Sequence, residues 1–231
     1  MKSKKGLVTG IIIGAVILLI GIGAVVLRMG LFKSFDAQGY VKATLDQNFK
    51  GEVKELATMV DGKSEKELMK QYEEGVEVFV TKNIATGIEM DKELEAKYIK
   101  LCEKIFASMK YDVKEAEKLE KGLYEVPVEF QSTDVFAQYM KLVKEESEHL
   151  VEKVEKGEFQ GTVEEINAQM QEEYLNNAYE LLEKAQKEAK YGEKKTMKFT
   201  VKQDENGLYM MDDAQIYEFI LKIMGLDAIQ D

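Results

Sequence analysis

The sequence predicts an α+β protein, with an N-terminal transmembrane helix followed by a helix-rich domain whose two β-hairpins form one antiparallel sheet. Three observations carry this prediction. An uncharged apolar run lies near the start, apolar residues then recur at helical spacing, and residues 126–131 and 196–203 instead show apolar residues at every second position. Helices that lead into hairpins are typical of α+β domains, in which helices cover one face of the sheet.

The apolar run, Gly6–Leu27, is 22 residues long and has no charged residue. As a helix it would measure about 33 Å, close to the ~30 Å hydrocarbon core of a bilayer. Three lysines lie in residues 1–5, whereas only Arg28 and Lys33 follow within the next residues. This bias favours a cytoplasmic N-terminus for residues 1–5, a signal-anchor at 6–27, a juxtamembrane linker at 28–35 and an extracytoplasmic domain at 36–231.

A cleaved signal peptide is the alternative interpretation of this run. Its apolar region would have about 7–15 residues and would end in a small-x-small site. The run is longer than that, and Val25-Val-Leu-Arg28 is a poor cleavage site. We therefore expect residues 6–27 to stay in the lipid bilayer of the cell membrane.

The part of the chain after the run is acidic. It holds 29 basic and 43 acidic residues, which leaves a net charge of −14. Nucleic-acid binding depends on cationic contacts with phosphates, so this balance argues against nucleic acid as a partner. Cys102 is the only cysteine, which excludes a disulfide within the chain.

Capping signals mark most of the expected helices. Asp36 is an N-cap and Gly51 a stop for the first helix, a shorter helix covers 52–60, and Asp91 opens a helix that ends near Met109. Ser64-Glu-Lys-Glu67 and Thr162-Val-Glu-Glu165 are capping boxes. The remaining expected helices run from Ser64 to before Gly87, over 134–156, from Thr162 to Ala189 and over 214–224. A short connection at 157–161 predicts that the two longest helices are antiparallel neighbours.

Two hairpins interrupt the helices. Residues 111–119 and 123–131 flank a turn at Gly122, and residues 196–203 and 208–211 flank a turn at Gly207. Val126, Val128 and Phe130 alternate with polar residues, which predicts a half-buried strand in a sheet of about four strands. Pro127 cannot donate a ladder hydrogen bond, so we expect it at a sheet edge, at a bulge, or with its missing donor facing outward.

A weak internal repeat supports an alternative organisation. Lys121-Gly-Leu-Tyr124 and Asn206-Gly-Leu-Tyr209 each precede a strand and then a helix. The domain would then consist of two related halves, at about 36–132 and 133–231. The same motif is also a good exit from a hairpin turn, which explains it without duplication.

The sequence predicts no catalytic, cofactor-binding or metal site. His149 is the only histidine and lies in a charged helical stretch, so we expect it on the surface. We expect Cys102, among apolar neighbours, to be a buried structural thiol. Asp204-Glu-Asn-Gly207 with Asp212 and Asp213 is acidic, but it lacks the spacing of a calcium loop, and a hairpin turn followed by an N-cap explains it. The eleven tyrosines and twelve methionines are expected mainly in the core, with a small apolar pocket between sheet and helices as the alternative.

Four segments resemble a known group of proteins, namely Tyr40–Asp46, Phe49–Gly51, Lys110–Val113 and Gly122–Val126. They resemble uncharacterised extracytoplasmic proteins of Gram-positive bacteria, many of them lipoproteins, that carry a domain of unknown function. Such domains look distantly similar to cystatin-like α+β folds. The chain departs from the lipoproteins because no anchoring cysteine follows the apolar run. The resemblance implies a location in the cell envelope and implies no activity, cofactor or functional residue.

These observations predict a binding or protein-interaction module at the cell envelope, anchored by a single span, and not an enzyme. Its partners would be the bilayer through residues 6–27, and an envelope protein or a small apolar ligand. One alternative is a structural subunit of an envelope complex. Another is a carboxylate-based wall hydrolase, which would need two acids in a shared cleft and a raised pKa.

Overall fold

The computed structural model describes residues 27–28, 35–60, 62–85 and 87–227. The signal-anchor predicted at Gly6–Leu27 therefore lies outside the described residues, except for Leu27. No helix within the described residues is both long and apolar enough to cross a membrane.

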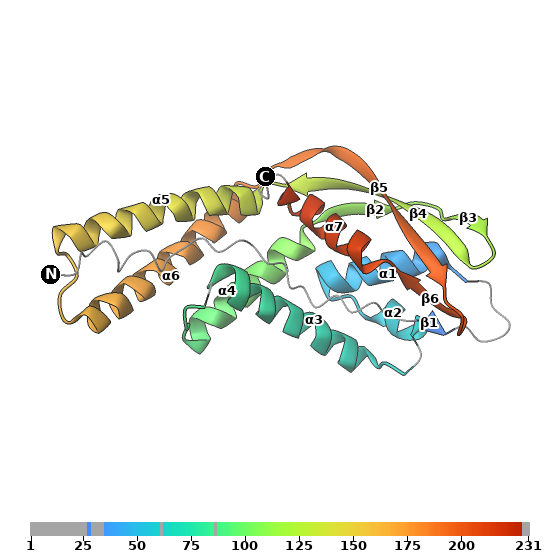
Figure 1. Cartoon of the computed structure of the whole chain (residues 1–231), viewed down its shortest axis with the longest axis horizontal. Helices are drawn as coiled ribbons and strands as arrows, with labels where there is room; N and C mark the ends of the chain where they lie inside the picture. Colours follow the sequence, from blue (N-terminus) through green and yellow to red (C-terminus); the bar gives the residue numbers. More distant parts are fainter. Residues whose placement is uncertain (1–26, 29–34, 61, 86, 228–231) are drawn as a thin grey trace.

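The described residues form an α+β structure with seven α-helices and one antiparallel sheet, as predicted (Figure 1). In chain order the elements are β1 (Leu27–Arg28), α1 (Ala37–Lys50), α2 (Lys54–Met59), α3 (Glu65–Phe79), α4 (Lys92–Ala107), β2 (Lys110–Val113), β3 (Glu117–Glu120), β4 (Leu123–Thr133), α5 (Val135–Lys156), α6 (Val163–Lys187), β5 (Tyr191–Gln203), β6 (Leu208–Met211) and α7 (Asp213–Ile223).

The predicted caps form. Asp36 accepts a hydrogen bond from the Gly39 amide, and Gly51 ends α1 with φ of 67°. Ser64 and Thr162 each complete a capping box, and Asp91 caps α4. One backbone feature has no counterpart in the prediction, because α3 passes into a π-helix at Val80–Ile84. The apolar spacing runs on through Ile84, so the sequence shows no signal for this change.

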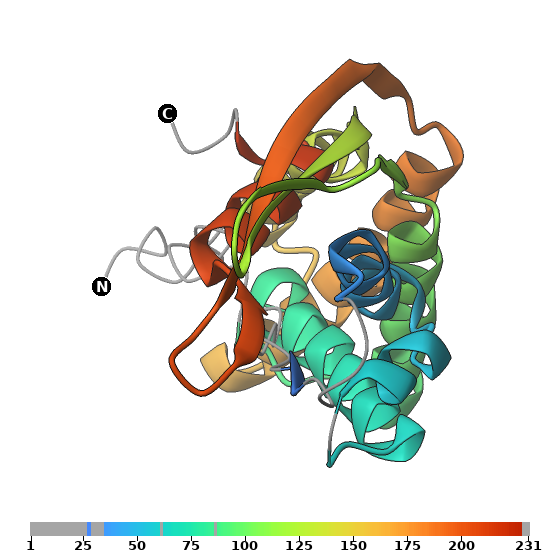
Figure 2. The same ribbon diagram turned by 90° about the vertical axis from the view of Figure 1, so that its right-hand side faces the viewer.

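The sheet has six strands rather than about four, in the order β1-β6-β5-β4-β2, with β3 also paired to β4. Val126, Val128 and Phe130 of β4 point to the buried face, as predicted. α1 and α7 pack on this face, and the strands arch over α1 (Figure 2). Phe219 of α7 is fully buried, and its ring lies 5.1 Å from that of Phe130 and 5.3 Å from that of Phe199.

Pro127 explains why the strand expected at 111–119 is two strands. It lies in β4, an interior strand, so of the three expected positions the sheet edge is wrong. The Lys114 amide donates to the Pro127 carbonyl at 2.8 Å, but Pro127 has no N–H to return a bond. β2 ends at Val113 and β3 begins only at Glu117. The position where Pro127 lacks an N–H therefore lies opposite the gap between these two strands.

β5 begins five residues earlier than the expected strand at 196–203. Residues 191–195 are Tyr-Gly-Glu-Lys-Lys and are exposed apart from the half-buried Tyr191, so they show no alternation of apolar and polar residues. They pair with the end of β4, where Thr133 lies opposite Tyr191. β4 and β5 thus form one long ribbon, and α5 and α6 are inserted between these two paired strands.

Candidate functional site

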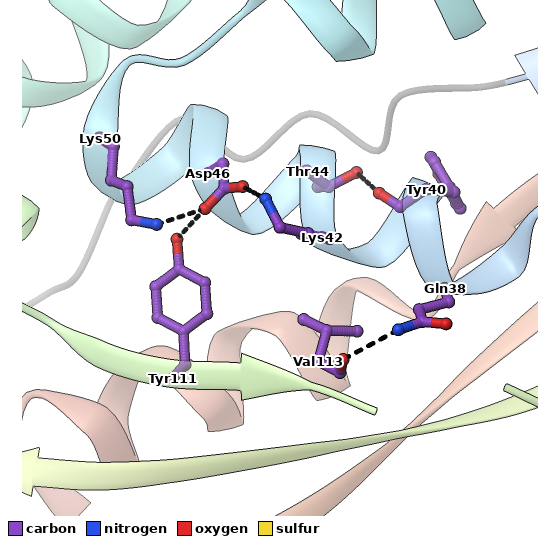
Figure 3. Close-up of polar contacts among 8 residues, drawn as sticks. All are labelled: Gln38, Tyr40, Lys42, Thr44, Asp46, Lys50, Tyr111 and Val113. Carbon is purple, nitrogen blue, oxygen red and sulfur yellow. Dashed lines mark hydrogen bonds and ion pairs between the residues drawn. The ribbon is translucent and has the colours of Figure 1, made fainter. Parts of the chain in front are cut away.

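The most buried ionic group of the described residues lies on α1. Asp46 is 3% exposed, and it is the only carboxylate among the buried polar residues of the described part of the chain. Lys42 and Lys50 lie one turn before and one turn after it, so the helix brings both ammonium groups to the carboxylate. Tyr111 of β2 reaches the same group from the sheet (Figure 3).

Every bond of the Asp46 carboxylate is charge-assisted or short. Its Oδ1 accepts hydrogen bonds of 2.7 Å from both Lys50 Nζ and the Tyr111 hydroxyl, and its Oδ2 pairs with Lys42 Nζ. Burial raises the pKa of Asp46, but these three donors outweigh it and hold the pKa below the ordinary value. Burial and the neighbouring Asp46 carboxylate raise the pKa of Tyr111.

This cluster fastens α1 to the sheet. Gln38 makes a second link of the same kind, since its Nε2 donates to the Val113 carbonyl at 3.1 Å (Figure 3). A carboxylate with a lowered pKa and three donors is a poor general base, because the reaction would first have to break those bonds. This cluster was not predicted from the sequence. The only signal for it in the sequence is that Lys42 and Lys50 lie four residues before and four residues after Asp46. No sequence pattern indicates that Tyr111 contacts Asp46.

Two hollows lie next to the cluster, one lined in part by Asp46 and the other in part by Tyr111. The first, of about 440 Å³, is lined by Lys42, Asp46, Glu52, Lys54 and Glu55 among others. The second, of about 260 Å³, is lined by residues of β2, β4 and β5, including Lys110, Asp112, Glu129 and Lys194. Acidic and basic side chains line both hollows, so neither is the small apolar pocket that was the alternative expectation from the sequence. Phe219 and its aromatic neighbours occupy the space between α7 and the sheet.

The residues singled out in the sequence are not part of this cluster and have ordinary roles. Cys102 is fully buried, as predicted, and burial raises its pKa. His149 is exposed, as predicted, with its Nδ1 3.9 Å from a Glu146 carboxylate oxygen. Asp204 accepts the amides of Asn206 and Leu208 within the β5–β6 turn, and Asp212 caps α7 through the Ala214 amide. Within the described residues, no three His, Cys, Asp or Glu side chains are grouped so as to hold a metal ion.

The second distinctive feature is the pair α5 and α6, which we call the arm (Val135–Lys187). The two helices are antiparallel and extend away from the sheet (Figure 1). The base of the arm is closed by two hydrogen bonds, from the Asp134 amide to the Lys190 carbonyl and from the Lys190 amide to Asp134 Oδ1. The whole arm therefore replaces the turn of the β4–β5 hairpin.

Tyrosines connect the arm to α4. The Tyr98 hydroxyl donates to the Leu175 carbonyl of α6 at 2.6 Å, and the rings of Tyr98 and Tyr179 meet edge to face at 5.3 Å. Tyr139 of α5 is also buried, but its hydroxyl has no hydrogen-bond partner among the described residues. Burial raises the pKa of Tyr174 in the same region to about 12. Burial raises the pKa of Tyr98 and Tyr139 as well, so these three phenols stay neutral at physiological pH and act in packing.

The distal part of the arm is acidic and has an apolar residue at its tip. Residues 145–173 hold ten glutamates and two lysines. Val163, the first residue of α6, is 51% exposed.

A scan of family models, a search of curated proteins and a search of solved structures found no match to this chain.

Proposed function

We propose that this chain is a membrane-anchored interaction module whose domain lies outside the cytoplasm and contacts an envelope protein through the arm. The observation that carries this proposal is the insertion of two long helices into a β-hairpin that a turn of a few residues could close. At about 1.5 Å per residue, the 25 residues of α6 extend about 37 Å. Such an element extends the protein away from the sheet and adds solvent-exposed surface for a partner, while the sheet and its core stay unchanged.

The anchor is supported by the sequence. An uncharged run of 22 residues with more basic residues before it than after it favours a single span with the domain on the extracytoplasmic side. The acidic distal arm is compatible with that location, since it favours solubility and is not attracted to anionic lipid.

The properties of Asp46 argue against the hydrolase alternative. That alternative requires a carboxyl group with a raised pKa in a cleft shared with a second acid. Asp46 is the deeply buried acid of the described residues, and its pKa is lowered by two lysines and a tyrosine. It therefore has the electrostatics of a structural ion pair.

The test is site-specific photocrosslinking in intact cells that express the full chain. A photoreactive residue replaces Glu158 or Val163 at the tip of the arm, and a control chain carries it at Lys198, which lies on the outer face of the sheet. We expect both tip positions to crosslink to the same protein and the control position not to. Val163→Asp should weaken that crosslink from position 158, because it places a charge in the contact. Equal products from tip and control positions, or none from the tip, would contradict the proposal.

The side of the membrane is tested separately. External protease added to intact cells should cleave the exposed 157–162 connection of the arm, and full protection until the membrane is permeabilised would place the domain inside. This assay does not depend on whether the arm has a partner.

A further inference from the structure

The first half of β5 is an open edge of the sheet, although β5 as a whole lies inside the strand order. β5 pairs with β4 along almost its whole length, whereas β6 pairs only with residues 201–203. Among the described residues, no strand lies beyond the first half of β5 on that side. Residues 192–196 and Lys198 are exposed, and Figure 1 shows this half of β5 along the upper rim of the molecule. We call Lys194–Lys198 the open edge.

The backbone groups that face outward from the open edge follow from one hydrogen bond. The Thr200 amide donates to the Gln215 side chain of α7 and not to β4. In an antiparallel pair, every second residue directs its amide and carbonyl away from the partner strand. The register with β4 is regular from Thr200 back to Lys194. The amides and carbonyls of Lys194, Thr196 and Lys198 therefore point the same way as the Thr200 amide, away from β4.

Pro127 gives independent support for this assignment. It lies opposite Lys198, and its carbonyl accepts from the Lys114 amide on the far side of β4 from β5. Pro127 and Lys198 therefore exchange no hydrogen bond across the two strands. The backbone groups of Lys198, and of the residues two and four positions before it, are directed to the open edge.

A side chain of α7 closes only the end of this edge. Gln215 Oε1 accepts from the Thr200 amide at 2.9 Å, and Gln215 Nε2 lies 3.5 Å from the Lys198 carbonyl oxygen. The side-chain amide thus takes the place that the backbone of a further strand would take. Among the described residues, no hydrogen-bond partner from the protein reaches the outward amides of Lys194, Thr196 and Lys198 or the carbonyls of Lys194 and Thr196.

The open edge is basic in a chain that is acidic as a whole. Residues 191–198 hold three lysines and one glutamate, whereas the whole chain has a net charge of −11. Lys194 and Lys198 are each paired with a single glutamate of β4. Lys195 makes no ion pair with any described residue. The lysines therefore keep positive charge along the edge.

Lysines on an open edge also protect it from unwanted pairing. If two copies of the chain paired about Thr196, Lys194 of each copy would lie opposite Lys198 of the other. Like charges directly opposite each other destabilise a sheet, whereas opposite charges stabilise it. The lysines therefore disfavour a second copy of this edge and favour a strand that carries carboxylates.

We propose that an extended acidic segment of another protein adds to the sheet along Lys194–Lys198 as a strand antiparallel to β5. Main-chain hydrogen bonds to the open edge provide the affinity, and carboxylates opposite the three lysines provide the specificity. Met197 is half-buried, so the residue opposite it is apolar. This surface is separate from the tip of the arm, and the inference does not depend on the membrane anchor or on the partner of the arm.

The test measures the binding of a fluorescein-labelled peptide to the purified full chain in neutral detergent by fluorescence anisotropy. The peptide contains Glu-Val-Thr-Glu-Glu, which as an antiparallel strand places glutamates opposite Lys198, Lys195 and Lys194 and valine opposite Met197. The control Lys-Val-Thr-Lys-Lys reverses the charge, and we expect it to bind at least tenfold more weakly. The control Glu-Val-Pro-Glu-Glu keeps the charge but lacks the amide that would bond to the Thr196 carbonyl, and we expect at least fivefold weaker binding.

A matched pair of variants tests the edge itself. Thr196→Pro removes an outward amide without removing a hydrogen bond to β4, a position at which sheets tolerate proline. Thr196→Ala keeps this amide. We expect the proline variant to bind the acidic peptide at least fivefold more weakly than the wild type and the alanine variant to bind within twofold. Circular dichroism checks that both fold. The double variant Lys194→Glu with Lys195→Glu should lose the acidic peptide and bind the lysine peptide instead, which decides the question if the proline variant unfolds.

Three outcomes overturn the inference. One is the absence of binding, or equal binding, of the acidic and lysine peptides by the wild type. Another is unchanged binding by a folded Thr196→Pro variant. The third is a concentration-dependent dimer that Thr196→Pro abolishes, because it assigns the edge to a second copy. In cells, a photoreactive residue at Lys198 should give a product distinct from that of the arm tip, so failure of the arm proposal leaves this inference unaffected.

Discussion

The body of the molecule, by which we mean the sheet with α1–α4 and α7, and the arm bury their apolar residues in different ways. In the body, Phe219 meets the rings of Phe49, Tyr111, Phe130 and Phe199, which come from α1, β2, β4 and β5. In the arm, a row of residues such as Leu150 and Met170 lies on the facing sides of neighbouring helices. Long-range contacts therefore dominate the body, whereas helical periodicity and local caps account for most of the arm. A substitution in the body should lower the stability of the whole fold, and one in the arm should act locally.

The largest effect is expected at the aromatic centre of the body. Phe219→Ala removes a ring that is fully buried, and we expect it to lower the free energy of unfolding by about 3–5 kcal/mol. Urea denaturation followed by circular dichroism measures this loss. Phe219→Leu is the control, since it keeps most of the volume and should cost clearly less. If the alanine variant lost less than about 1 kcal/mol, Phe219 would not be the centre of the body's core.

The next effect concerns the Asp46 cluster. Asp46→Asn keeps the size of the side chain but removes both ion pairs and weakens the bond to Tyr111, so we expect a loss of about 2 kcal/mol. Lys42 and Lys50 are partly exposed and can return to water, which limits the loss. The control is Glu74→Gln, which breaks the exposed Lys70–Glu74 pair and should cost about 0.3 kcal/mol.

The same cluster predicts a pH dependence. The pKa of Asp46 is lower in the folded chain than its ordinary value of 3.8. Its contribution to stability is therefore fully present above about pH 4 and is lost as the pH falls through the lower folded value. Unfolding curves between pH 5 and 2 should fall less steeply for Asp46→Asn than for the wild type. Parallel curves would show that the ionised carboxylate does not stabilise the fold.

A smaller effect should distinguish two tyrosines where the arm meets α4. Tyr98→Phe removes a hydrogen bond to the Leu175 carbonyl and should cost about 1 kcal/mol. Tyr139→Phe removes a buried hydroxyl without a hydrogen-bond partner, so it should leave stability unchanged or raise it by up to about 1 kcal/mol. Thermal denaturation of the two variants in parallel tests whether their changes in stability relative to the wild type differ in this way. A loss for Tyr139→Phe equal to that for Tyr98→Phe would show that the Tyr139 hydroxyl has a partner in solution.

The contrast between body and arm also explains how much the sequence could predict. Caps at Asp36, Ser64, Asp91 and Thr162 are local signals, and each one began a helix where expected. The link between Asp46 and Tyr111 joins residues 65 positions apart, and no local pattern encodes it. The first five residues of β5 were missed for a related reason, because they pair beyond the core and have no apolar face. The connection of β1 to β6 was missed because Leu27 completes the apolar run.

The smallest effects are expected at the two capping boxes, one in the body and one in the arm. Ser64→Ala and Thr162→Ala each remove a side-chain acceptor for the amide three residues later, a change worth about 1 kcal/mol of helix stability. In the body, this loss should appear in the global free energy of unfolding, because α3 packs against α1 and α4. In the arm, it should appear as faster amide hydrogen exchange near residues 163–170, with a change below about 0.5 kcal/mol in global unfolding. If Thr162→Ala lowered global stability as much as Ser64→Ala does, the arm and the body would unfold as one unit and not as two.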